Sequence, residues 1–133
     1  MRVSRETMHR HHEAIVAVAA RMVRQHGIQG VSVSDVMQAA GLTHGGFYRH
    51  FASKEALVAE TTTAIFADIT ARLEARPGRS AATALKQYAV DYLSVSHVEH
   101  PERGCPIAAY GADIAREGDS IKAAYTSGLE RLL

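Results

Sequence analysis

The segment Val31–Phe51, VSVSDVMQAAGLTHGGFYRHF, has the pattern of two short helices joined by a tight turn. Ser32 is a common N-capping residue, and Asp35 follows at capping-box spacing, with Asp in place of Glu. Gly41 then ends the first helix, because glycine adopts the left-handed conformation without steric cost. In the second helix, the spacing turns Phe47 and Phe51 inward. A helix, a glycine turn and a short polar-faced helix form the helix-turn-helix motif, whose second helix enters the DNA major groove.

Three predicted helix N-termini lie in or just after this segment, near Ser32, Thr43 and Ser53, and free N–H groups at such ends bind phosphate. Side chains that can donate to phosphates are those of Ser32, Thr43, Tyr48, His50 and Lys54. Base reading is expected from the exposed part of the second helix, at His44, Gly45, Gly46 and Arg49. Tyr48 and His50 have a second interpretation, in which they pack and seal the edge of the motif.

A family resemblance rests on these residues. Ser32-Val33-x-Asp35-Val36 and Ala40-Gly41-Leu42-Thr43-x-Gly45-x-Phe47-Tyr48-x-His50-Phe51-x-Ser53-Lys54-Glu55-x-Leu57 closely resemble the DNA-binding domain of TetR-type transcriptional regulators, over about residues 10–60. The resemblance implies the same phosphate contacts, with His44, Gly45 and Tyr48 approaching bases. His44 and Gly46 depart from the pattern, in which Lys or Arg and a larger side chain are common. It also implies a homodimer on double-stranded operator DNA, and a C-terminal helical pocket where a small-molecule inducer loosens DNA binding by shifting the two heads through the fourth helix.

Apolar residues at helical spacing elsewhere predict an all-α fold. Further helices are expected at about residues 4 or 7 to 26, 54–75, 81–98, 106–116 and 120 onward, with stops at Gly27, Arg76-Pro77-Gly78 and Gly118 and caps at Ser53, Ser80 and Asp119. Residues 1–53 are predicted to be the helix-turn-helix domain, and residues 54–133 a helical ligand-binding and dimerisation region. The last apolar stripe, Leu129, Leu132 and Leu133, runs to the end of the sequence, so this region is expected to be incomplete or shortened.

Several local features have two interpretations. The basic arm Met1–Thr7 is either a frayed terminus or a minor-groove contact. Gly30 is expected to supply a special backbone angle. The run Thr61-Thr62-Thr63 is weak in an isolated helix, which suggests tertiary support or a bend. His9, His11 and His12 do not share one helical face, so they indicate a solvated helix start rather than a metal site.

Composition limits the function classes. The chain of 133 residues is 47% hydrophobic and 22% charged, as in ordinary globular proteins. No apolar run suits a membrane span or a signal core, so a cytoplasmic location without membrane partners is expected. Residues 1–54 hold seven Lys or Arg and three acidic residues, whereas residues 55–133 hold eight and eleven, so the basic end suits a polyanion. We find no catalytic pair, phosphate loop or metal-ligand set, which indicates a protein that is not an enzyme and needs no cofactor.

The C-terminal half offers two candidate sensing features. Tyr88, Tyr92, Tyr110 and Tyr125 either line an amphipathic ligand cavity or form ordinary core. Cys105, the single cysteine, precedes Pro106 at a predicted helix start, where a thiol becomes more reactive, and His100 and Arg103 lie close in sequence. Cys105 is therefore either an electrophile or redox sensor or a small buried capping residue. Three functions remain open: a ligand-responsive repressor, a thiol-sensing repressor, and a truncated or orphan helix-turn-helix protein without ligand response.

Overall fold

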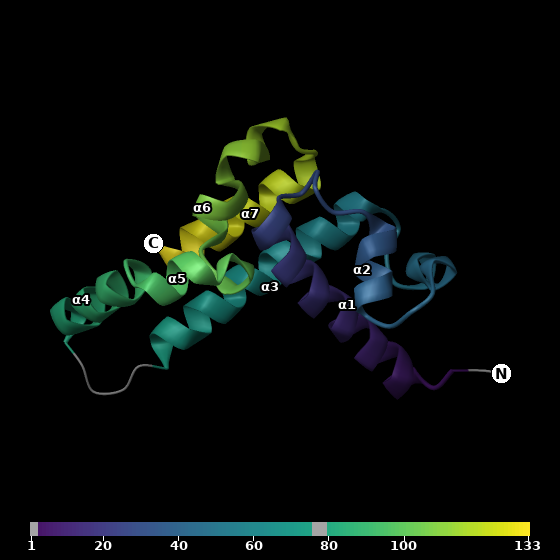
Figure 1. The fold of residues 1–133 in the computed structure, drawn as a ribbon, viewed down its shortest axis with the longest axis horizontal. Helices are drawn as coiled ribbons and strands as arrows, with labels where there is room; N and C mark the ends of the chain where they lie inside the picture. Colours follow the sequence, from purple (N-terminus) through teal and green to yellow (C-terminus); the bar gives the residue numbers. More distant parts are fainter. Residues whose placement is uncertain (1–2, 76–79) are drawn as a thin grey trace.

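The computed structural model describes residues 3–75 and 80–133, and all regular structure in these ranges is helical (Figure 1). This confirms the predicted all-α fold. The elements in chain order are α1 (Arg5–His26), α2 (Val33–Ala39), the 3₁₀ helix η1 (His44–Arg49), α3 (Lys54–Glu74), α4 (Ala81–Tyr92), α5 (Val95–Glu99), the 3₁₀ helix η2 (Pro101–Arg103), α6 (Pro106–Tyr110), the 3₁₀ helix η3 (Gly111–Arg116) and α7 (Asp119–Leu132).

The ends of α2 follow from short-range chemistry and confirm the predicted caps. Ser32 Oγ accepts from Asp35 N at 3.0 Å, and Asp35 Oδ2 accepts from Ser32 N at 3.1 Å, which completes a capping box. At the other end Gly41 has a φ of 73°. Gly41 N donates to Gln38 O and Leu42 N to Met37 O, the two hydrogen bonds of a Schellman motif. The turn of the helix-turn-helix is thus fixed within a dozen residues of sequence.

Two apolar clusters hold the elements together. The N-terminal cluster joins α1, α2, η1 and the start of α3, and consists of Ile15, Val18, Ala19, Val31, Val36, Met37, Phe47, Phe51 and Leu57. The C-terminal cluster joins the end of α1 to α3, α6, η3 and α7, and consists of Val23, Ile28, Val58, Ile65, Phe66, Tyr110, Ile114, Ile121 and Tyr125. Helices α1 and α3 contribute to both clusters, so they connect the two halves of the molecule.

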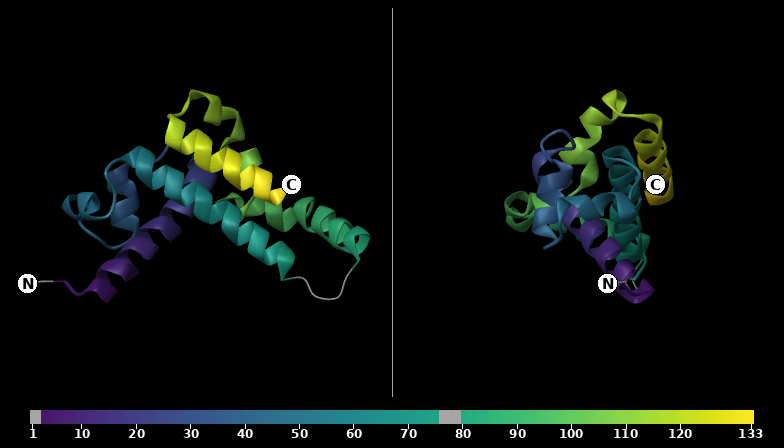
Figure 2. Two further views of the ribbon diagram at one scale, coloured as in Figure 1. Left: turned by 180° about the vertical axis from the view of Figure 1, so that it is seen from behind. Right: turned by 90° about the vertical axis from the view of Figure 1, so that its right-hand side faces the viewer.

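Helix α7 lies along α3 in both figures, and the two helices make extensive contact (Figures 1 and 2). Their close approach depends on Gly128, where a Cβ would lie 2.4 Å from the ring of Phe66. The threonine run is supported by tertiary structure: Thr61 and Thr62 are fully buried, and Thr62 Oγ1 lies 3.0 Å from Tyr110 Oη. Buried hydroxyls therefore tie the middle of α3 to α6.

Several predicted boundaries are wrong in the C-terminal half. The helix expected over 81–98 is two helices, because Ser94 caps α5 by accepting from His97 N. The helix expected over 106–116 changes to 3₁₀ geometry at Gly111, and Gly118 rather than Asp119 occupies the N-cap of α7. Gly30 does not supply a positive φ, since the described residues with positive φ are Gly27 and Gly41. A Cβ at Gly30 would instead lie 2.3 Å from the carbonyl oxygen of His26, so the glycine permits a close backbone approach.

Helix α4 lies at the opposite end of the molecule from α2 (Figures 1 and 2). None of its described residues is buried, and Leu85 and the C-cap residue Leu93 are 68% and 81% exposed. Ala84, Gln87, Tyr88 and Tyr92 are half-buried. The apolar residues of this segment are therefore divided between a partly covered face and open surface. The predicted stop at Arg76-Pro77-Gly78 and residue Arg2 of the basic arm lie outside the described residues.

Candidate functional site

The second helix of the motif is a six-residue 3₁₀ helix, η1. Thr43 occupies the N-cap position of η1, as the predicted helix start requires, but within the described part of the chain its Oγ1 makes no capping hydrogen bond. Phe47 anchors η1 because it is fully buried and stacks on Phe51, with ring centroids 5.6 Å apart. Side chains three residues apart eclipse in a 3₁₀ helix. Tyr48 therefore lies in line with Gly45, and Arg49 in line with Gly46.

The outer surface of η1 combines exposed polar side chains with bare backbone. Tyr48 is 69% exposed, and His44 and Arg49 are also exposed. A Cβ at Gly45 would meet no described atom within 4 Å, and one at Gly46 would make only ordinary contacts, with Thr43 Oγ1 at 3.6 Å and Met37 Cε at 3.8 Å. Neither glycine is required by backbone angle or by internal space. Because Gly45 and Gly46 have no side chains, the outer face of the η1 backbone is open to an approaching molecule.

His50, at the C-terminal end of η1, is half-buried in a group of rings. Its centroid lies 5.7 Å from that of His12 and 6.4 Å from that of His11. His12 stacks on Phe51 at 4.5 Å and places its Nε2 atom 2.7 Å from Glu60 Oε2 on α3. Burial lowers the pKa of His50, and the positive charge of protonated His12, protonated His11 and Arg49 lowers it further. His50 thus packs against α1 while its remaining surface faces solvent.

The other predicted phosphate contacts lie at helix starts. The Ser32 hydroxyl accepts from Asp35 N, and the Ser32 side chain also hydrogen-bonds to the Asp35 carboxyl. Ser53 Oγ accepts from Ala56 N, so the cap predicted for α3 is confirmed, and Lys54 is the first residue of that helix. The capping role of Asp35 also has an electrostatic consequence. Hydrogen bonds from Ser32 hold the pKa of the Asp35 carboxyl below its usual range, so α2 begins with a fixed negative charge.

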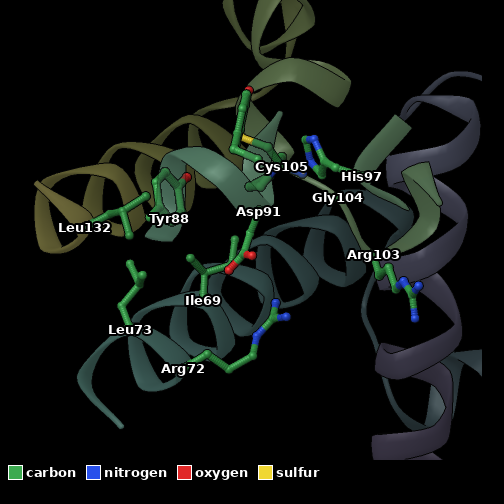
Figure 3. A pocket seen from close by; sticks show the side chains of 12 residues that line it. Ile69, Arg72, Leu73, Tyr88, Asp91, His97, Arg103, Gly104, Cys105 and Leu132 are labelled. Carbon is green, nitrogen blue, oxygen red and sulfur yellow. Dashed lines mark hydrogen bonds between the residues drawn. The ribbon is translucent and has the colours of Figure 1, made fainter. Parts of the chain in front are cut away.

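A cavity of about 220 Å³ lies between α3, α4, the η2–α6 segment and the end of α7 (Figure 3). Its wall is apolar at Ile69, Leu73, Pro106 and Leu132, aromatic at Tyr88 and Tyr92, and polar at Arg72, Asp91, His97, Arg103 and Cys105. The cavity brings together three residues of the predicted ligand site: Tyr88, Tyr92 and Cys105. An apolar floor with a few polar groups is typical of sites for small amphipathic molecules.

The other two predicted ligand residues lie deeper, within the C-terminal cluster. Tyr110 is buried, and this burial raises its pKa to about 12 while its hydroxyl pairs with Thr62. Tyr125 packs edge-on against Phe66 with ring centroids 5.4 Å apart. Sequence reasoning missed His97, whose ring lies tilted against Tyr92 with centroids 4.6 Å apart and whose Nε2 accepts from Cys105 N at 3.1 Å. A capping serine three residues before His97 was the available signal, because it predicts a helix start at Ser94.

The two groups expected to activate Cys105 have other partners. His100 Nδ1 lies 3.1 Å from Glu102 Oε1, and Arg103 Nη2 donates to Ser96 Oγ at 3.4 Å. The Cys105 side chain raises the pKa of the nearby Tyr92 phenol, chiefly through hydrogen bonding. Among residues 3–75 and 80–133, no three His, Cys, Asp or Glu side chains are grouped to hold a metal ion. No helix in these ranges combines the length and hydropathy that crossing a bilayer requires.

Sequence comparison finds known proteins that are similar to the N-terminal part of this chain. The profile of the family described as bacterial regulatory proteins, tetR family, matches residues 15–61. The HTH-type transcriptional repressor KstR2 of Mycobacterium tuberculosis is 39% identical over 46 residues, which is 35% of this chain and 23% of that protein. KstR2 of Rhodococcus jostii is 33% identical over 55 residues, or 41% of this chain and 27% of that protein. The family profile thus matches the N-terminal part of the chain.

The fold similarity extends further. A putative transcriptional regulator of the TetR/AcrR family superimposes with a TM-score of 0.74 at 24% identity, over 93% of this chain and 65% of that chain. Escherichia coli NemR in its reduced form superimposes with a TM-score of 0.77 at 20% identity, over 92% and 65%. The chain thus spans about two thirds of these solved structures. The matched family and the solved neighbours are described as transcriptional regulators. The helix-turn-helix part of this chain, within residues 15–61, is thus similar to the tetR family of bacterial regulatory proteins.

Proposed function

We propose that this regulator is a cytoplasmic repressor that binds an inverted-repeat operator as a homodimer and is released by a small molecule in the cavity. Residues 1–53 act as the DNA-binding domain, and residues 54–133 belong to a ligand-binding and dimerisation region. One observation carries the proposal: a buried Phe47 holds η1 so that Tyr48 and Arg49 extend into solvent behind a Schellman turn. Such an edge suits the DNA major groove.

In this proposal the contacts divide by type. Ser32, Thr43, Tyr48, His50 and Lys54 donate to backbone phosphates, which fix position and make affinity salt-dependent. His44, Arg49 and the backbone at Gly45 and Gly46 approach base edges. Arg49 is the side chain best suited to direct readout, because a guanidinium forms paired hydrogen bonds with guanine.

The test is fluorescence anisotropy on the DNA upstream of the gene, titrated at several salt concentrations. Lys54→Ala should weaken binding and reduce the slope of log affinity against log salt by about one, because one phosphate contact is lost. Lys86→Ala, on the exposed surface of α4, is the matched control. Tyr48→Phe separates the phenol hydroxyl from the ring, and Tyr48→Ala removes both. Unchanged affinity in Lys54→Ala and Tyr48→Ala would refute the contact assignment.

Gly45 gives a sharper test of groove approach. Because a Cβ there meets no described atom within 4 Å, Gly45→Ala should leave folding stability the same or slightly higher. If the backbone of η1 approaches base edges closely, the added methyl group should weaken DNA binding by about tenfold or more. A variant that folds well and binds DNA as tightly as the parent would place Gly45 away from the groove.

Dimerisation and release are measured separately. Sedimentation equilibrium with and without operator DNA should show a dimer on the DNA. A monomer that binds DNA with no response to any cavity ligand would instead favour an orphan helix-turn-helix protein. Helix α3 is the expected connection between the sites, because it contributes Leu57 to the N-terminal cluster and Ile69 to the cavity wall.

A thiol-sensing repressor is the second candidate, favoured by the position of Cys105 on the cavity wall beside Tyr92. E. coli NemR, which shares this fold, was solved in its reduced form. If Cys105 is the sensor, a mild oxidant should release the protein from DNA, and Cys105→Ser should abolish that release without weakening DNA binding in reducing buffer. Release that persists in Cys105→Ser would exclude the thiol.

A further inference from the structure

One peptide group stands between the cavity and the helix-turn-helix domain. Cys105 N donates to His97 Nε2 at 3.1 Å, and Gly104 O accepts from Arg24 Nη1 at 3.4 Å. The nitrogen of Cys105 and the carbonyl of Gly104 belong to the same peptide bond, whose atoms lie in one rigid plane. A rotation of this plane therefore changes both hydrogen bonds together. Figure 3 shows His97, Gly104 and Cys105 grouped on one side of the cavity.

On the cavity side, the acceptor is held by an aromatic contact. A neutral imidazole carries one proton, so acceptance at Nε2 places the His97 proton on Nδ1. The His97 ring lies tilted against that of Tyr92, and the ring centroids of Tyr92 and Tyr88 are 5.9 Å apart. All three side chains line the cavity. An occupant that displaces Tyr92 or bonds to His97 therefore moves the acceptor of the Gly104–Cys105 peptide.

On the other side, the donor belongs to α1. Arg24 is half-buried, and its Nε atom donates to Ala20 O at 2.9 Å, which fixes the guanidinium along its own helix. Burial lowers the pKa of Arg24, as expected for a charge withdrawn from water. Six and nine residues earlier, α1 places Val18 and Ile15 in the N-terminal cluster with Phe47 of η1. A displacement of Arg24 is thus passed along a packed helix to the recognition element.

The peptide has little room to move. Gly104 is buried, and a Cβ there would lie 3.1 Å from His97 Nε2 and 3.4 Å from Pro101 O. Its φ of −87° is ordinary, so a side chain is opposed by space and not by backbone strain. Residues of η2 also contact α1 directly. The segment Pro101–Cys105 therefore fills the gap between cavity and α1.

We propose that the Gly104–Cys105 peptide is a relay that couples occupancy of the cavity to the position of α1, through His97 on one side and Arg24 on the other. This inference rests on the proposed function, because it assigns a route of regulation to the cavity and DNA surface described above. It differs from coupling through α3 alone, since it enters the DNA-binding domain by α1.

The single cysteine provides the probe. N-ethylmaleimide adds to Cys105, so it fills the cavity at a known atom without any leaving group, and mass spectrometry confirms one adduct per chain. The relay predicts that the adduct weakens operator binding about tenfold, a usual size for coupling between sites. In Arg24→Met, which keeps the aliphatic stem and removes every donor, the adduct should change affinity less than twofold. Arg21→Met, at an exposed position on the same helix, should respond like the parent. Cys105→Ser treated with the reagent is the reagent control.

A second measurement does not depend on labelling. If His97 and Arg24 act through one peptide, the double variant His97→Ala/Arg24→Met should bind operator no more weakly than the weaker-binding single variant. Single-variant effects that multiply, or single variants without any effect, would overturn the relay. An adduct that leaves the parent unchanged, or affects parent and Arg24→Met equally, would also overturn it. If the unmodified parent does not bind DNA at all, the proposed function itself fails, which is a distinct result.

Discussion

Replacing Gly128 by alanine tests the packing that joins α7 to α3. The new Cβ would lie 2.4 Å from Phe66 Cγ and Cδ2 and 2.7 Å from Phe66 Cβ. Carbon atoms in favourable contact are about 3.5–4.0 Å apart, so about 1 Å of extra separation is needed. Rotation of the ring does not provide it, because Phe66 Cβ is attached to the backbone of α3 and Tyr125 packs edge-on against the ring.

The magnitude follows from two opposed effects. Overpacking of this kind costs about 1–3 kcal/mol. Alanine in a helix interior recovers about 0.5–1 kcal/mol relative to glycine. Subtracting the lower values and the upper values of these ranges, we expect Gly128→Ala to lower the free energy of unfolding by about 0.5–2 kcal/mol. The Tm should fall by several degrees.

Urea unfolding followed by far-ultraviolet circular dichroism measures this change. Ser127→Ala, at the neighbouring exposed position of α7, is the control and should alter stability by less than about 0.5 kcal/mol. If Gly128→Ala unfolds at a higher urea concentration than the parent, helix propensity outweighs the clash. The close α3–α7 contact would then not constrain the fold as argued.

Three further predictions concern a cap and two titrations. Ser32→Ala should cost about 1 kcal/mol in urea unfolding because the α2 cap is lost, whereas Ser34→Ala, exposed on the same helix, should cost less. Burial and neighbouring positive charges lower the pKa of His50, and a bound phosphate would raise it. DNA binding should therefore take up a proton and strengthen as pH falls from 8 to 6, and His50→Gln should weaken this dependence in anisotropy titrations. Burial raises the pKa of Tyr110 to about 12, whereas an unfolded tyrosine ionises near 10. The unfolded state loses its proton first, so stability should fall between pH 10 and 12, by up to about 2.7 kcal/mol, and Tyr110→Phe should remove that part of the fall in pH-dependent unfolding.

Local chemistry explains which parts of the fold could be predicted. The capping box at Ser32 and the left-handed Gly41 each depend on residues within a few positions, so the sequence pattern predicts them correctly. At Gly111, where α6 gives way to η3, a Cβ would lie 2.7 Å from the hydroxyl of Tyr125, so the position favours glycine. That contact joins positions 14 residues apart, so the helical spacing of apolar residues does not predict it.

The residues proposed for the cavity also divide into those that the sequence predicts correctly and those that it does not. Tyr88 and Tyr92 were predictable as a pair because they are one turn apart on a helix, and both line the cavity. Tyr110 had the same sequence signal, yet its hydroxyl pairs with Thr62 in the core. His97 was missed, because the single helix expected over 81–98 would have carried it away from Cys105. The break at Ser94 turns the chain and brings the imidazole back to the Cys105 amide.

The 3₁₀ geometry of η1 limits how much sequence information one copy can extract. Six residues at about 2.0 Å per residue make an element about 12 Å long. Base pairs are spaced about 3.4 Å along the DNA axis, so η1 spans about three or four of them. A fully read tetranucleotide occurs by chance about once in 256 positions, whereas a genome offers about 10⁶ or more competing sites. One copy of η1 would therefore match thousands of sites in a genome. Recognition of a unique site requires that several such elements contact the same DNA.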